Sequence, residues 1–159
     1  MKKISALLIL LILFYSCSKQ EQGLLIDNSL QLSFINTQGE DLLDPETVNS
    51  IKVEEIEMYY LKDNKMVRAN DSRLDNPKMF SVYYSNTREK NVLSFLSSLY
   101  LDDKNQATTY LKLKSDDIDT ITCKMHEYNP TLVTEAFYNG ELIILNQIKN
   151  DFAVIIKDY

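Results

Sequence analysis

The sequence has no tryptophan, a single histidine and only three glycines, and these shortages exclude several kinds of site. Gly23, Gly39 and Gly140 lie too far apart to build a phosphate-cradling loop or a dinucleotide fingerprint, which need closely spaced glycines. One histidine, His126, and two distant cysteines leave no His-rich or paired-cysteine zinc spacing. We therefore expect neither a metal nor a cofactor.

Basic clusters are missing as well. The chain carries 17 Lys and Arg against 23 Asp and Glu, which gives a formal net charge of −6 and a pI of about 4.8. Non-specific nucleic-acid binding depends on cationic patches that displace counterions. Because no Lys or Arg block exists beyond Lys2 and Lys3, we expect no nucleic-acid partner.

The beginning of the chain is its longest apolar run. Met1, Lys2 and Lys3 precede an almost wholly apolar stretch over residues 4–15, and Ser16 and Cys17 follow it. A cationic start, an apolar middle and a small residue before the cleavage position are typical of a secretory signal peptide. A membrane-spanning helix needs about 20 apolar residues, so a transmembrane anchor or a buried helix is the less favoured alternative.

The end of this run resembles the lipobox of bacterial lipoproteins, with the sequence Leu13-Phe14-Tyr15-Ser16-Cys17. The following CSKQE is similar to the start of mature lipoproteins from the Bacteroidetes group. This resemblance implies that residues 1–16 are a lipoprotein signal peptide and that Cys17 is acylated, for example with palmitate. A charged tract after the cysteine can direct such proteins to the cell surface. Lys19 and Glu21 form only a short tract, so the periplasmic and the surface-exposed side of the outer membrane both stay open.

The mature chain divides into a tether and one domain. Residues 17–28 are mostly polar and show no sustained period, which is typical of a tether. Residues 29–159 have the length of a single domain with one core.

Alternating apolar and polar residues predict a succession of short strands in this domain. Asp63-Asn64 and Asn139-Gly140 are typical two-residue hairpin turns. Residues 92–100 fit either a helix or a strand, and we expect a strand over residues 92–96 because the neighbouring segments are all β. A closing strand is expected over residues 152–156. The apolar rows are Leu30, Leu32 and Phe34; Ile56, Met58 and Tyr60; Phe80, Val82 and Tyr84; Leu111 and Leu113; and Ile121, Cys123 and Met125.

About eight to ten short strands with frequent turns predict an all-β fold, an antiparallel β-sandwich of Ig-like or transthyretin-like type. The phrases GEDLLDPET, IEMYYLKDNK, TTYLKLKSDDIDTI and AFYNGELI are similar to those of a set of small Bacteroidetes lipoproteins. That resemblance implies a lipoprotein β-domain and carries no catalytic residue to this chain.

Two groups of side chains could carry chemistry. Cys123 lies in an apolar row, whereas His126 falls on the opposite face of the same strand, so we expect a buried thiol and not a Cys-His pair. The carboxylates of Asp116, Asp117 and Asp119, with the acidic pair Asp102 and Asp103 in an earlier loop, could hold Ca²⁺, although the spacing is not that of an EF-hand. We favour a solvated hairpin turn whose carboxylates accept local backbone N–H groups.

Tyrosine is abundant, with ten residues, and Tyr59, Tyr83, Tyr110 and Tyr138 could lie opposite the apolar rows. Exposed tyrosines give a rigid contact area for proteins or sugars, but packing in a second layer is the favoured alternative.

The expected function is therefore non-catalytic. We expect an outer-membrane lipoprotein, anchored through lipid on Cys17, whose β-sandwich binds an envelope protein, a host protein or a glycan. A hydrolase or inhibitor module acting on envelope or extracellular polymers is one alternative. A subunit that assembles by pairing edge strands is another.

Overall fold

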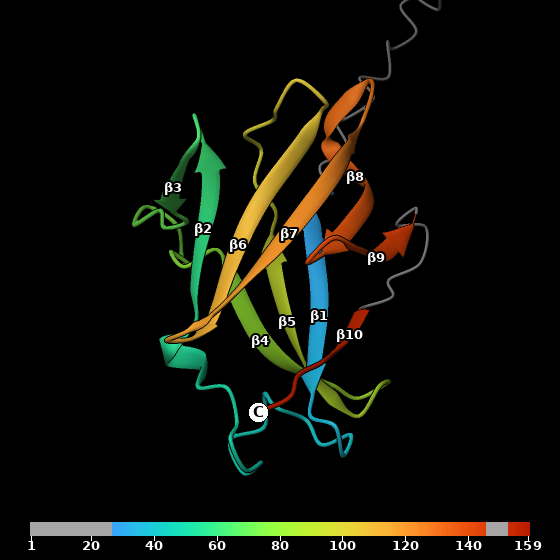
Figure 1. Cartoon of the computed structure of the whole chain (residues 1–159). Coiled ribbons are helices and arrows are strands. Elements are labelled where there is room, and N and C mark those ends of the chain that lie inside the picture. The colour runs from blue at the N-terminus through green and yellow to red at the C-terminus, as the bar shows by residue number, and fades with distance from the viewer. Residues whose placement is uncertain (1–26, 146–152) are drawn as a thin grey trace, which may run out of the picture.

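A computed structural model describes residues 27–145 and 153–159 (Figure 1). The expected signal peptide, Cys17 and residues 17–26 of the expected tether lie outside the described residues. The described part contains ten strands and one 3-10 turn, η1 (Val53–Glu55). Two open sheets pack against each other, so the predicted all-β sandwich is confirmed.

The two sheets contain four and six strands. The smaller sheet has the order β10 (Ala153–Ile156), β1 (Ser29–Ile35), β5 (Lys90–Leu96) and β4 (Phe80–Ser85). The larger sheet has the order β3 (Lys65–Arg68), β2 (Glu57–Lys62), β6 (Gln106–Lys114), β7 (Asp117–His126), β8 (Asn129–Tyr138) and β9 (Glu141–Leu145). In Figure 1 the six-stranded sheet lies in front of the four-stranded sheet.

The core lies between the sheets and follows the alternation of the sequence. Leu30, Leu32 and Phe34 of β1 face inward and are buried, and so are Leu93 and Phe95 of β5. Burying a side chain of this size contributes about 1.5–3 kcal/mol. The ambiguous segment is thus a strand, as expected, because its apolar side chains complete the row next to β1.

Both predicted two-residue turns are present. Asp63 and Asn64 connect β2 to β3 with φ of 49° and 58°, and Asn139 and Gly140 connect β8 to β9 with φ of 49° and 88°. A type I′ turn needs positive φ at both central residues, which Asn, Asp and Gly adopt at low cost.

Strand β10 is paired in a way that the alternation did not indicate. It runs parallel to β1, with Leu32 opposite Ala153 and Ile35 opposite Ile156, whereas all other pairs of named strands in the described residues are antiparallel. Parallel neighbours cannot be joined by a tight turn. The chain therefore enters the smaller sheet three times, at β1, at β4 and β5, and again at β10.

The residues after β10 connect the two sheets. The ammonium of Lys157 contacts both carboxylates of β7: Nζ lies 3.0 and 2.9 Å from the oxygens of Asp117 and 2.8 and 2.7 Å from those of Asp119. The Tyr159 hydroxyl donates a hydrogen bond to Asp117, and the Lys114 ammonium lies 3.6 Å from the centroid of the Tyr159 ring.

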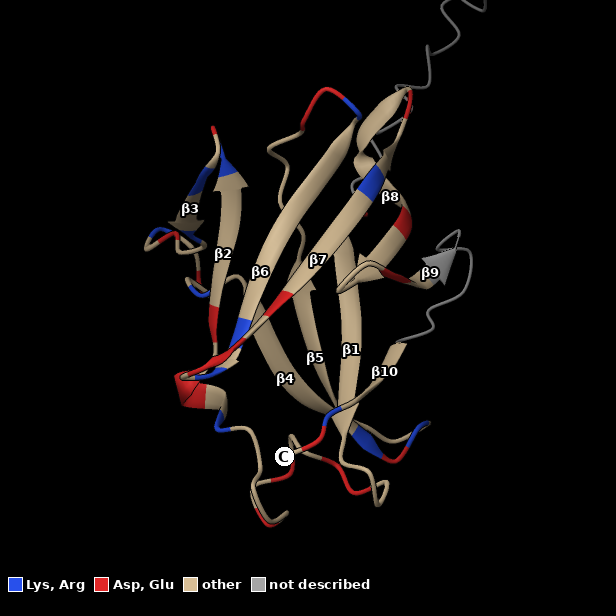
Figure 2. Ribbon diagram, viewed as in Figure 1, with Lys and Arg blue, Asp and Glu red and all other residues tan. Residues whose placement is uncertain are grey.

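This arrangement corrects the expectation of a solvated turn. The side chain of Asp119 is 3 % exposed, because it belongs to β7 and not to the turn. Lys157 occupies the place between the carboxylates that a bound cation would take. Among the described residues no group of three or more His, Cys, Asp or Glu side chains could hold a metal ion. Figure 2 shows the acidic residues gathered at this end of the molecule, around η1 and the β6–β7 turn.

We predict that Lys157→Met lowers the free energy of unfolding by about 3–5 kcal/mol, because it leaves carboxylates buried without a counter-charge. Urea denaturation measures this loss. The triple variant with Asp117→Asn and Asp119→Asn added should lose less than Lys157→Met alone, since no charge then stays buried.

Lys52→Met is the matched control, because Lys52 and Glu55 form an exposed ion pair, with side chains 63 % and 58 % exposed. Exposed pairs contribute about 0–1 kcal/mol, so this variant should unfold nearly as the parent does. Equal stability of the two lysine variants would contradict the structural role of Lys157.

Candidate functional site

The four tyrosines singled out in the sequence do not form one surface. Tyr59 of β2 and Tyr110 of β6 are cross-strand neighbours on the outer face of the six-stranded sheet, and both are half-buried. The Tyr59 hydroxyl donates to Glu57 Oε2 over 3.0 Å. Tyr83 is 42 % exposed on β4, which belongs to the other sheet. Of the four, the structure therefore brings together only Tyr59 and Tyr110.

Tyr138 lies in the core, so its expected place opposite the apolar rows is wrong. It is 7 % exposed, and its ring centroid lies 6.4 Å from that of Phe34. Its alternation partner Ala136 is buried on the same face of β8. Burial raises the pKa of the Tyr138 hydroxyl far above its ordinary value, and the neighbouring Asp119 adds to this rise. Tyr138 is therefore not available to an external partner.

Cys123 and His126 are placed as the alternation predicted. The thiol of Cys123 is buried, and burial raises its pKa to about 12. His126 is exposed at the end of β7, and its Nδ1 accepts a hydrogen bond from the backbone N–H of Tyr128. The two side chains therefore do not form a nucleophile–base pair.

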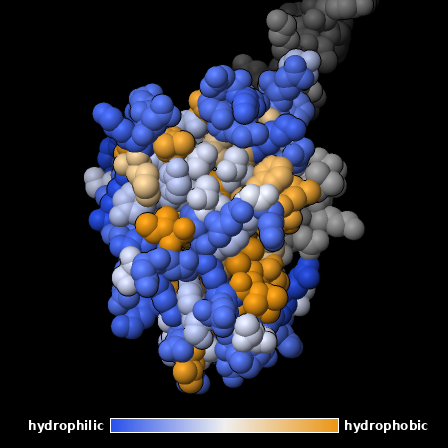
Figure 3. Space-filling view, viewed as in Figure 1, coloured by the Kyte–Doolittle hydropathy of each residue, from blue (hydrophilic) through white to orange (hydrophobic). Residues whose placement is uncertain are grey.

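The outer face of the six-stranded sheet offers no continuous apolar area. Figure 3 shows this face as largely hydrophilic, with separate orange patches. The Glu57 carboxylate there is within 2.7 Å of Arg68 and 3.3 Å of Lys112. The hydrogen bond from Tyr59 is the largest of several contacts that lower the pKa of Glu57. Charged and tyrosine side chains thus cover this sheet.

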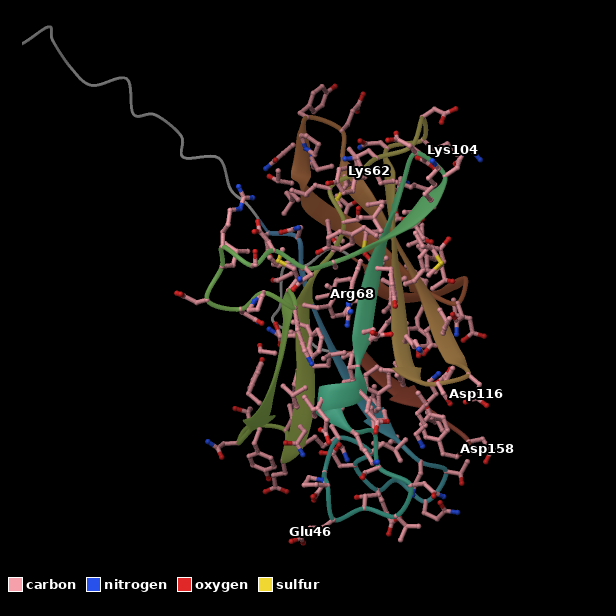
Figure 4. All side chains as sticks on the ribbon, turned by 90° about the vertical axis from the view of Figure 1, so that its left-hand side faces the viewer. Glu46, Lys62, Arg68, Lys104, Asp116 and Asp158 are labelled. Atoms are coloured by element: carbon pink, nitrogen blue, oxygen red, sulfur yellow. The ribbon has the colours of Figure 1, made fainter. Side chains whose placement is uncertain are left out.

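Within the described residues, a groove at one end of the sandwich is the best candidate for a binding site. It has a volume of about 410 Å³ and lies between the end of the β2–β3 hairpin and the loop that joins β5 to β6. Figure 4 shows Lys62 and Lys104 at this end, with Glu46, Asp116 and Asp158 at the other. The groove is lined by Leu61, Lys62, Asp63, Asn64, Leu99, Tyr100, Leu101, Asp102, Asp103, Gln106 and Thr108.

The loop that forms one wall of the groove is held by buried hydrogen bonds. Asn28 and Ser97 bond twice: the Ser97 N–H donates to the Asn28 carbonyl at 2.8 Å, and Asn28 Nδ2 donates to the Ser97 carbonyl at 2.9 Å. The Ser98 N–H donates to Thr109 Oγ1 at 3.1 Å, and the Tyr100 N–H donates to Ser98 Oγ at 3.0 Å. These bonds fix the backbone on which Tyr100 stands.

The segment from Asp102 to Gln106 of the same loop is a turn that the Asp102 carboxylate stabilises. Asp102 Oδ1 accepts the backbone N–H groups of Lys104 and Gln106, each at 2.9 Å. Asn105 follows with a positive φ of 59°, and its side-chain Nδ2 donates to the Met125 carbonyl at 2.9 Å. Asp102 is therefore a turn-forming residue that also lines the groove.

The Tyr100 ring is held in place and still accessible, with 45 % of the residue exposed. The Tyr60 ring meets it edge-on, with a centroid separation of 6.4 Å and an interplanar angle of 62°. Tyr60 is itself fixed, because its hydroxyl donates to the Leu96 carbonyl at 3.0 Å, and burial raises its pKa to about 12. The Lys62 ammonium lies 4.7 Å from the Tyr100 ring centroid.

Three polar side chains of the groove are available to a ligand. Within residues 27–145 and 153–159, Asp63, Asn64 and Asp103 make no side-chain hydrogen bond or ion pair with another protein group. Asp63 and Asn64 form the β2–β3 turn, whereas Asp103 belongs to the opposite wall. The groove thus presents free hydrogen-bonding groups on both of its walls.

Sequence reasoning did not identify Tyr100. It lies in the ambiguous segment NVLSFLSSLY, just beyond the end of β5, and belongs to no alternating row. The neighbouring pair Asp102 and Asp103 was noticed only as an acidic loop. Its proximity to the β2–β3 turn depends on the pairing of β2 with β6, in which partners such as Glu57 and Lys112 or Tyr60 and Thr109 are far apart in the sequence.

Two other hollows in the described part of the chain are less suited to a ligand. One, of about 460 Å³, borders the exposed His126 and Tyr128 rings, whose centroids are 6.0 Å apart. Its Lys124 is paired with Glu135 at 3.3 Å, so this charge is already compensated. The other, of about 250 Å³, is a shallow apolar hollow beside β4 and β5.

The described residues thus form a two-sheet β-sandwich with a groove at one end, between the β2–β3 hairpin and the loop that joins β5 to β6. Comparisons with protein-family models, with curated proteins and with solved structures found no match to this chain. Within the two described ranges, no helix has the length and apolar character needed to cross a membrane.

We predict that the Cys123 thiol does not react with Ellman's reagent at pH 8 in the folded protein, because the thiolate is the reactive form and burial suppresses it. The measurement uses the Cys17→Ala variant, which leaves Cys123 as its one cysteine. The thiol should react fully in guanidinium chloride. Native-state labelling as fast as that of a small free thiol would contradict the buried position.

Proposed function

We propose that this chain is an outer-membrane lipoprotein, anchored by lipid on Cys17, whose β-sandwich binds a protein or glycan partner without catalysis. The observation that carries the binding role is the groove at Tyr100. Its aromatic ring is exposed but fixed, and its walls carry polar side chains with no partner inside the described protein. Small-molecule sites typically have volumes of about 300–1,000 Å³ and combine apolar surface with a few polar groups.

The anchor rests on the sequence. The apolar residues 4–15 and the LFYSC sequence that ends at Cys17 support export and lipidation. One acyl chain binds a membrane only marginally, whereas two or more hold a protein firmly. A fully extended residue spans at most about 3.3–3.6 Å, so residues 17–26, which precede the first residue paired in the fold, could place the domain up to roughly 35 Å from the lipid.

The position of the groove relative to the anchor supports a capture role. Asn28, the last residue of the proposed tether, is buried and forms two hydrogen bonds with Ser97, at the start of the groove loop. The backbone of Asp27 also pairs with β8, through Thr131 and Val133. The tether would therefore enter the fold beside the groove, which would hold a bound partner close to the membrane.

The groove chemistry favours binding over hydrolysis. Asp102 uses one carboxylate oxygen to close its own loop, and Tyr100 and Leu99 expose apolar surface beside it. Cys123 and His126 lie on different faces of β7, so they support no nucleophilic mechanism. A fixed aromatic ring with free polar neighbours is suited to recognition.

We predict that Cys17→Ala leaves the domain folded but releases it from membranes, because the anchor lies outside the core. Intact mass of the native protein should show loss of residues 1–16 and addition of acyl chains. Membrane fractionation with an alkaline carbonate wash measures the release. Protease shaving of whole cells then decides between the surface and the periplasmic side.

Cys123→Ala is the matched control, because it removes the other cysteine of the chain without touching the lipidation sequence. This variant should stay in the membrane fraction. Retention of Cys17→Ala after the carbonate wash, or a native protein without acyl mass, would refute the lipid anchor.

A further inference from the structure

We infer that the Tyr100 groove is a saccharide site that accepts neutral or amine-bearing sugars and discriminates against acidic ones. The inference rests on the proposed binding function and specifies its ligand. It joins three properties of the groove: a preset aromatic platform, free hydrogen-bonding groups on both walls, and an excess of negative charge.

The platform suits the apolar side of a sugar ring. The face of a tyrosine ring is the negative part of its quadrupole and attracts positively polarised groups, such as the axial C–H bonds of a pyranose. The Lys62 ammonium, 4.7 Å from the centroid of the Tyr100 ring, shows that the ring already attracts a cation in the free protein. Lys62 is exposed, so its flexible side chain can move aside and donate to a sugar hydroxyl.

The platform is set before the ligand arrives. Tyr60 contacts the edge of the Tyr100 ring, and the Tyr60 hydroxyl is bonded to the Leu96 carbonyl. The bonds of Ser98 to Thr109 and to the Tyr100 N–H hold the backbone. Binding then costs little ordering of the protein, which matters for a weakly bound and strongly hydrated ligand such as a sugar.

The walls match the hydroxyls of a sugar. A hydroxyl both donates and accepts, a carboxylate accepts, and an amide does both. Asp63 and Asn64 on one wall and Asp103 on the other are exposed, and within the described ranges their side chains have no internal partner. A ring stacked on Tyr100 would thus meet acceptors on two sides and a donor from Asn64.

The charge of the groove sets its selectivity. One lysine, Lys62, stands among three lining aspartates, Asp63, Asp102 and Asp103, and the whole chain carries a net charge of −6. Like charges brought together at an interface oppose binding, whereas an ammonium on the sugar would be attracted. Uronic and sialic acids should therefore bind more weakly than neutral sugars or glucosamine.

The test is a titration of the full lipidated protein in a detergent without a sugar head group. Three sets of oligosaccharides serve as probes: neutral hexose oligomers, glucosamine oligomers and galacturonic acid oligomers. Because the chain has no tryptophan, its tyrosine fluorescence reports binding directly. We expect neutral or glucosamine oligomers to change the emission, and galacturonic acid oligomers to bind at least tenfold more weakly.

Variants assign the binding to the groove. Tyr100→Ala should weaken binding at least tenfold, whereas Tyr100→Phe, which keeps the ring, should bind within about threefold of the parent. Asp103→Asn should weaken glucosamine binding more than neutral-sugar binding, and added salt should act in the same direction. Tyr84→Ala is the matched control, because Tyr84 is 55 % exposed on β4, outside the groove. Unchanged thermal unfolding must accompany each variant.

The outcomes separate this inference from the function on which it rests. If no probe binds, or if acidic oligomers bind as well as the others, the saccharide inference is overturned. If a protein partner then crosslinks to the parent but not to Tyr100→Ala, the binding function survives with a different ligand. If Tyr100→Ala changes neither sugar binding nor crosslinking, the groove is not the binding site and both proposals fail.

Discussion

The packing of the two sheets at the acidic end of the sandwich depends on the contact of Lys157 with Asp117 and Asp119. Among the described residues, the short edge strand β10 pairs only with β1. Its four residues therefore form few hydrogen bonds with the sheet. The ammonium of Lys157 reaches from this strand to β7 in the other sheet and contacts all four carboxylate oxygens. Tyr159 and Lys114 surround the same cluster. One charged group therefore joins the two sheets at the acidic end and compensates two carboxylates that the fold buries.

The opposite end is organised by polar contacts of a different kind. Asn28 ties the first strand of the domain to Ser97, and Ser98 and Asp102 hold the loop that carries Tyr100. These bonds leave the ring of Tyr100 exposed while the backbone below it is fixed. The molecule thus has an acidic end, where Figure 4 labels Asp116 and Asp158, and an opposite end with the groove, where it labels Lys62 and Lys104.

This division has a functional meaning if the chain is lipid-anchored as proposed. The tether would enter the domain at Asn28, on the groove side, and the residues that hold the groove loop would be the first residues of the fold. A ligand in the groove would then lie near the lipid, within reach set by the tether length.

Most of the strands, two hairpin turns and the burial of Cys123 could be predicted from the sequence. Each of these follows from local alternation or from turn residues, which act over a few positions of the chain. The parallel pairing of β10, the burial of Asp119 and Tyr138, and the groove at Tyr100 depend on tertiary contacts and could not be predicted. Lys157 meets Asp119 across 38 positions. One wall of the groove comes from the β2–β3 hairpin and the other from the loop that joins β5 to β6. A local pattern shows which face a side chain takes, but only the packing of the two sheets decides which distant groups it meets.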